Sequence, residues 1–97
     1  MMEPTMRKIL RHWPFERMRL ESAKPDTLVG VLIITCEREG TYWPVAAFQV
    51  PLAGARFSAN AFAGQCKGSL GALYVTVADP GERTRILTEV RALIRAR

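Results

Sequence analysis

The sequence is poor in the residues that carry most enzymatic chemistry. It has one histidine, His12, and two cysteines, Cys36 and Cys66. It contains no phosphate-binding loop, no glycine-rich dinucleotide motif, no His-Glu-x-x-His zinc helix and no Gly-x-Ser-x-Gly nucleophile motif. Because catalysis needs several such groups in one place, we predict a non-enzymatic protein that uses no cofactor and no metal ion.

The two cysteines lack the close Cys-x-x-Cys spacing that structural zinc sites usually use. Cys36 falls in the most apolar segment of the chain, which predicts a buried core residue of low reactivity. Cys66 falls in a loop-like segment, so we expect an exposed thiol, for which a redox role stays open. The first twenty residues contain no export signal, so reduced cysteines in the cytoplasm are expected rather than a disulfide.

Long hydrophobic runs are also lacking. The longest apolar stretch, residues 28–36, is far shorter than the roughly 20 residues of a membrane-spanning helix. With 48% hydrophobic and 24% charged residues, the composition is that of an ordinary folded domain. The 97 residues therefore predict one domain over 1–97, with residues 1–6 as a flexible tail and no membrane association.

Acidic residues are fewer than basic ones, 9 against 14, which gives a net charge of +5. The excess lies at the two ends, because residues 1–20 and residues 80–97 each carry five bases and two acids. If the two ends meet in space, they form one basic face of the kind that attracts nucleic acid or an acidic protein surface. A GC-rich genome also raises arginine content, so charge alone does not establish binding.

Hydrophobic periodicity predicts four strands, over residues 17–21, 28–38, 41–50 and 71–78, after a short helix at 7–13. The strand at 28–38 is apolar on both faces, so we expect it in the interior of the sheet or covered on both sides. Pro44 lies inside the following strand. Because proline cannot donate to a sheet ladder, that strand is expected to be an edge or to carry a bulge.

The C-terminal segment has clear helix signals. Asp79 is a good N-cap, Pro80 suits the first helical position, and Glu82 completes a capping-box pattern, which together predict a helix over 80–96. Its apolar residues form a core-facing stripe of Ile86, Leu87, Val90, Leu93 and Ile94. Turns are expected at 22–26 and over 51–69, the latter with a helical turn at 58–63. The predicted fold is α+β, a small antiparallel sheet of about four strands with an amphipathic C-terminal helix packed on one face.

Several aromatic residues lie close to arginines in the sequence. Single-strand binders use aromatic rings as stacking platforms beside arginines that follow the backbone. Tyr42 and Trp43 are adjacent in a strand and point to opposite faces, so one of them is expected to face away from the main core. Alternatively, these rings close the core of a small domain. The candidate binding residues are Arg11, Trp13, Arg17, Arg19, Tyr42, Trp43, Arg85, Arg91 and Arg95.

The preferred hypothesis is a small basic binding protein that engages nucleic acid through clustered arginines and exposed aromatics. The alternative is a protein–protein interaction module, such as an adaptor or a small inhibitor from a phage or mobile element. Such a module would act through the edge strand at 41–50 or through a homodimer interface. Either contact would explain a strand that is apolar on both faces.

Overall fold

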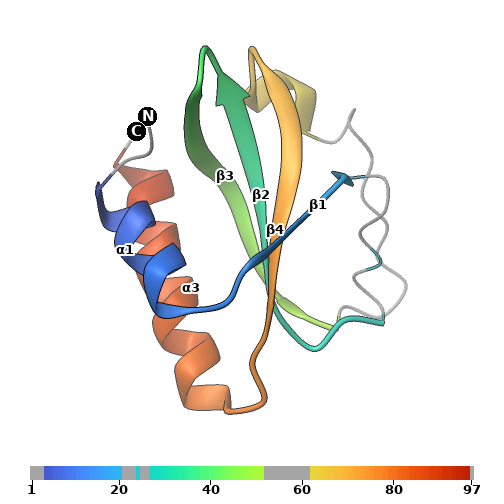
Figure 1. Ribbon diagram of the computed structural model, residues 1–97, viewed down its shortest axis with the longest axis vertical. Coiled ribbons are helices and arrows are strands. Elements are labelled where there is room, and N and C mark those ends of the chain that lie inside the picture. Colours follow the sequence, from blue (N-terminus) through green and yellow to red (C-terminus); the bar gives the residue numbers. More distant parts are fainter. Residues whose placement is uncertain (1–3, 21–23, 25–26, 52–61, 97) are drawn as a thin grey trace.

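The computed structural model describes residues 4–20, 24, 27–51 and 62–96. The elements are α1 (Pro4–His12), β1 (Glu16–Met18), β2 (Gly30–Arg38), β3 (Thr41–Val50), the short 3₁₀ helix η2 (Ala63–Gln65), β4 (Ser69–Thr76) and α3 (Pro80–Arg95). The four strands form one antiparallel sheet in the order β1-β4-β2-β3 (Figure 1). This confirms the predicted α+β fold with a four-stranded sheet and a C-terminal helix.

Both α-helices lie side by side next to one face of the sheet (Figure 1). The first turn of α1 and the last turn of α3 lie at the same end of the pair, so the two helices run antiparallel. Their apolar stripes meet alternate residues of the strands in a helix-side core. Its buried members are Ile9, Val31, Ile33, Ala47, Leu73, Val75, Val77, Ile86, Leu87 and Val90. In the described part of the chain, neither helix has the length and apolarity that a bilayer crossing requires.

The start of α3 follows from its local sequence. The Asp79 carboxylate accepts a hydrogen bond from the backbone N–H of Glu82 at 3.0 Å, and Pro80 is the first residue of the helix. This cap satisfies one of the amide groups that have no partner at a helix N-terminus. The predicted stripe is confirmed, with Ile86 and Val90 fully buried against the sheet.

β2 is an interior strand and is buried on both faces, as predicted. The face away from the helices packs into an opposite core, in which Leu32 and Ile34 contact residues from the segments before β2 and before β4. The buried members of this core are Leu20, Leu32, Ile34, Cys36, Val45, Val50, Phe62, Ala72 and Tyr74. The chain itself therefore covers both apolar faces of β2, and no dimer is needed to explain them.

β3 is an edge strand, and its pairing with β2 shifts in register between Ile34 and Thr35. Pro44 pairs with Thr35 directly beside this irregularity. Both expectations for the proline-containing strand, an edge position and a bulge, are confirmed. The reason is the missing N–H of proline, which cannot complete a regular ladder.

Two glycines permit the close approach of β2 and β4. A Cβ at Gly30, whose φ is +144°, would lie 2.0 Å from the carbonyl oxygen of Val75. A Cβ at Gly68 would lie 2.0 Å from the carbonyl oxygen of Glu37, at the other end of the pair. Any larger residue would force the strands apart at these points, so the two glycines hold the register that aligns Glu37 with Ser69.

Cys36 and Cys66 form a disulfide, with Cα atoms 5.6 Å apart and a separation of 30 positions in sequence. The expectation of a reduced pair, with Cys66 as a free loop thiol, is therefore wrong. Cys36 lies in the opposite core, as expected, and Cys66 packs at the margin of that core. The pairing of Glu37 with Ser69 brings the chain just before β4 next to the end of β2, and this long-range contact places the two sulfur atoms together.

Other boundaries differ slightly from the predictions. α1 begins at Pro4, inside the stretch expected to be a flexible tail, and β1 ends at Met18 rather than at 21. β4 begins at Ser69, two residues earlier than predicted. Of the predicted turns at 22–26 and 51–69, residues 22–23, 25–26 and 52–61 lie outside the described residues. Phe62 is buried in the opposite core.

The Tyr74 hydroxyl forms hydrogen bonds with Val29, the residue that precedes β2. It donates to the Val29 carbonyl at 2.7 Å and accepts from the Val29 N–H at 2.9 Å, so it satisfies both backbone groups of that residue. We expect Tyr74→Phe to lower the free energy of unfolding in urea by about 1–2 kcal/mol, because the two bonds to Val29 and a third, accepted from the Thr76 hydroxyl, are lost. Tyr42→Phe is the control, since its hydroxyl bonds to the exposed Arg17. A loss no greater than that of the control would contradict this role.

Candidate functional site

The exposed surface of α1 is basic. Arg7, Lys8 and Arg11 are exposed on this helix, and no acidic residue occurs between Pro4 and His12. Arg11 and His12 lie in the last turn of the helix. The helix packs against the sheet through Ile9, so the charged side chains remain on the solvent side. The described exposed side chains of α1 are therefore basic.

α3 adds further cations beside α1. Arg85, Arg91 and Arg95 are exposed, as are its two acids, Glu82 and Glu89. Because the two helices are antiparallel, the first half of α1 lies beside the C-terminal turns of α3 (Figure 1). The two basic ends of the chain thus meet in space. We call the exposed basic residues of the two helices the basic layer, namely Arg7, Lys8, Arg11, Arg85, Arg91 and Arg95.

One member of the basic layer also has a structural contact. An Arg91 terminal nitrogen donates to the Ala47 carbonyl at 3.2 Å. Ala47 belongs to the edge strand β3, so this bond links α3 to the sheet edge. Arg91 consequently contributes to the packing of α3 as well as to the surface charge.

Arg17 lies apart from the basic layer, in a cluster with Tyr42 and Glu37 on the sheet. Its guanidinium Nη2 donates to the Tyr42 hydroxyl and lies 3.6 Å from a Glu37 carboxylate oxygen. The guanidinium carbon also lies 4.7 Å from the centre of the Tyr42 ring, within the range of a cation–π contact. These contacts orient the Arg17 side chain. It is 68% exposed and therefore remains accessible from solvent.

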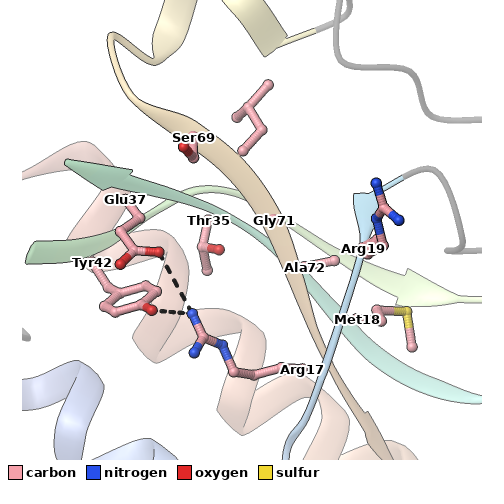
Figure 2. Close-up of a pocket in the computed structure, with 10 residues that line it drawn as sticks. Arg17, Met18, Arg19, Thr35, Glu37, Tyr42, Ser69, Gly71 and Ala72 are labelled. Carbon is pink, nitrogen blue, oxygen red and sulfur yellow. Dashed lines mark hydrogen bonds and ion pairs between the residues drawn. The ribbon is translucent and has the colours of Figure 1, made fainter. Parts of the chain in front are cut away.

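The cluster forms one wall of a basin of about 450 Å³ on the sheet. Figure 2 shows Thr35 and Gly71 between this wall and Arg19, with Ser69 at one end. Strand pairing explains the grouping, because Glu37 is opposite both Ser69 and Tyr42, while Thr35 is opposite Gly71. The polar residues Thr35 and Glu37 continue the face of β2 that carries Val31 and Ile33 in the helix-side core.

An apolar hollow of about 200 Å³ adjoins the basin. It is lined by Leu10, Phe15 and Leu73, together with Arg17 and Tyr42. The Arg17–Tyr42 pair therefore lines both spaces and forms the boundary between them. Leu10 and Phe15 are only half-buried, so the hollow opens to the surface.

The aromatic residues take part in packing more than the sequence hypothesis assumed. Trp13 and Phe15 are half-buried against the helix-side core. Trp43 is half-buried against the opposite core, which covers the second face of its strand. One face of the Tyr42 ring is occupied by Arg17. These positions favour the alternative in which the rings close the core of a small domain.

The nine candidate residues thus separate into three groups. Arg11, Arg85, Arg91 and Arg95 lie in the basic layer, Arg17, Arg19 and Tyr42 line the basin, and Trp13 and Trp43 pack against the cores. Sequence reasoning missed the basin residues Thr35, Glu37, Ser69 and Gly71. The available signal was the change from apolar to polar residues on one face of β2, from Ile33 to Thr35 and Glu37.

No family model matches the chain, and no curated protein or solved structure matches it either. Among the described residues, no group of three or more histidine, cysteine, aspartate or glutamate side chains is placed to hold a metal ion. The functional argument therefore depends on the charge and shape of the surfaces described above.

Proposed function

We propose that this protein is a non-enzymatic binding protein that holds the phosphate backbone of nucleic acid on its basic layer. The observation that carries the proposal is the antiparallel packing of α1 and α3, which brings two separately basic ends of the chain side by side. Clustered arginines and lysines of this kind neutralise phosphates and release condensed counterions on binding.

The positions of the aromatic rings support a backbone-directed mode of binding. Trp13 and Trp43 pack against the cores, and Arg17 covers one face of Tyr42, so little ring surface is available for stacking with bases. Phosphate contacts carry no sequence information by themselves. The proposed binding is therefore largely independent of nucleotide sequence.

The test is a fluorescence-anisotropy titration of the purified protein against labelled single-stranded and double-stranded oligonucleotides over a salt series. If about five phosphates are contacted, the logarithm of the association constant should fall with the logarithm of salt concentration with a slope of about −4 to −5. Affinity should depend little on base sequence. Absence of binding at low salt would refute the proposal.

The disulfide bears on where this binding takes place. Structural disulfides persist in oxidising compartments and are rare in the reducing cytoplasm. The Cys36–Cys66 bond therefore argues against the cytoplasmic location expected from the sequence. We include an oxidising compartment in the proposal, and thiol alkylation of the protein in its native host, followed by mass measurement, tests it.

A protein–protein role has one specific observation in its favour. β3 is an edge strand of ten residues, Thr41–Val50, and contains no charged residue. Charged side chains are a common means by which edge strands avoid pairing with other chains, whereas here Pro44 and the register shift are the protective features. Binding to a protein partner or a second copy through this edge would be insensitive to salt and would be weakened by substitution of Tyr42 or Trp43.

A further inference from the structure

We propose that the basin and the adjoining hollow form a second site, which binds a small carboxylate attached to an apolar group. This inference is independent of nucleic-acid binding, because neither space is lined by a residue of the basic layer. The two spaces together combine a few oriented polar groups with an apolar pocket wall, as small-molecule sites generally do.

The oriented polar group is Arg17. Its Nη2 atom makes both polar contacts, to the Tyr42 hydroxyl and to the Glu37 carboxylate. Within the described part of the chain, its Nε and Nη1 donors have no acceptor, so they remain for a ligand. A guanidinium held in this way binds a carboxylate with a charge-assisted hydrogen bond, the stronger class of hydrogen bond in proteins.

The floor of the basin leaves room for the ligand. Gly71 has no side chain, and a Cβ at this position would lie 3.4 Å from the Thr35 hydroxyl oxygen. The Thr35 side chain is 5% exposed and lines the basin, and the Ser69 hydroxyl lines the same space. These hydroxyl groups can donate to the oxygen of a carboxylate that Arg17 holds.

The charge of the basin favours a monoanion. Its lining contains Arg17, Arg19 and one glutamate, Glu37. Glu37 lies 3.6 Å from the Arg17 guanidinium, so a phosphate dianion that approaches Arg17 would also be repelled by this carboxylate. A carboxylate carries a single negative charge, so Glu37 repels it less than it repels a dianion.

The hollow specifies the other half of the ligand. Leu10, Phe15 and Leu73 line it on the far side of the Arg17–Tyr42 boundary. An aliphatic or aromatic group placed there would be removed from water while its carboxylate remained beside Arg17. Burial of such a group stabilises the complex in proportion to the apolar area covered. The ligand class is therefore an apolar carboxylate, such as an N-acylated hydrophobic amino acid.

The experiment is a titration of the full oxidised chain with N-acetylphenylalanine, followed by backbone amide NMR shifts. We expect saturable shifts at Ser69 and Gly71, roughly tenfold weaker binding of N-acetylphenylalanine amide, and weaker binding of inorganic phosphate. Arg17→Met should weaken binding of the acid by at least about tenfold, and Gly71→Ala should also weaken it by filling the floor. Arg38→Met, which removes an exposed base outside the basin, should have no effect.

Two results would overturn this site. One is equal binding of the acid, its amide and phosphate, and the other is unchanged binding of the acid in both Arg17→Met and Gly71→Ala. Neutralising Arg11, Arg85 and Arg95 should leave the titration unchanged, because none of them lines either space. Failure of the carboxylate site and failure of nucleic-acid binding are thereby distinguishable.

Discussion

Replacing Arg11, Arg85 and Arg95 by glutamine should weaken nucleic-acid binding by roughly a hundredfold at about 0.1 M salt. Each arginine that contacts a phosphate contributes about one unit to the salt slope, so the slope should become less steep by about three units. These three side chains are exposed, and the substitutions leave the helix-side core intact. Anisotropy titrations of the variant and the wild-type chain over the same salt series measure both quantities.

The matched control neutralises three exposed bases outside the basic layer, Lys24, Arg38 and Lys67. Both triple variants have the same net charge, so a difference between them reports the position of the charges rather than their number. The control should retain a salt slope close to that of the wild-type chain. Equal losses in the two variants would show that overall charge attracts the nucleic acid and that the basic layer is not the binding surface.

Breaking the Cys36–Cys66 disulfide should lower the free energy of unfolding by about 3–4 kcal/mol. The bond joins residues 30 apart, and a cross-link over a loop of that length restricts the unfolded chain to about this extent. Cys66→Ala is the preferred variant, because it leaves the fully buried Cys36 side chain in place and removes only a partly buried sulfur at the margin of the opposite core. Urea unfolding monitored by tryptophan fluorescence measures the loss.

Reductant separates the effect of the cross-link from that of the substitution. Reduction should bring the wild-type stability down to that of Cys66→Ala and should leave the variant unchanged. An unfolding midpoint of the wild-type chain that is insensitive to full reduction would show that the bond does not stabilise the fold. The basic layer is next to the other face of the sheet, so phosphate binding should persist in any reduced molecules that remain folded.

Local sequence signals were enough to predict the elements and their type. The Asp79–Pro80 start and the apolar stripe of α3 can be recognised from residues that are close together in sequence. The reason is that a helix repeats every 3.6 residues and is capped by a neighbouring side chain. The apolar strand at 28–38 and the proline in the next strand likewise predicted an interior strand beside an edge strand. These features depend on the period of side chains along one segment, which the sequence states directly.

The burial of the aromatic side chains and the pairing of the cysteines depend on contacts between segments that are far apart in sequence. The sequence left open whether the rings are exposed or buried and predicted reduced cysteines, because neither Trp43 nor Cys66 shows in its own neighbourhood what will cover it. In the fold, the opposite core covers the face of β3 that carries Trp43, and the β2–β4 register brings Cys66 to Cys36. A second core formed from segments far apart in sequence has no single local pattern.

The sequence by itself determined that the chain is basic at both ends, is apolar in its central strand and has an amphipathic helix after the last strand. Only the tertiary structure decided that the two ends lie side by side, because that requires α1 to pack antiparallel beside α3. The basin was likewise decided by strand pairing, which places Glu37 opposite both Tyr42 and Ser69. The physical reason is that charge and hydrophobic periodicity are properties of a single segment. A site, in contrast, depends on the distances between segments, which only long-range packing sets.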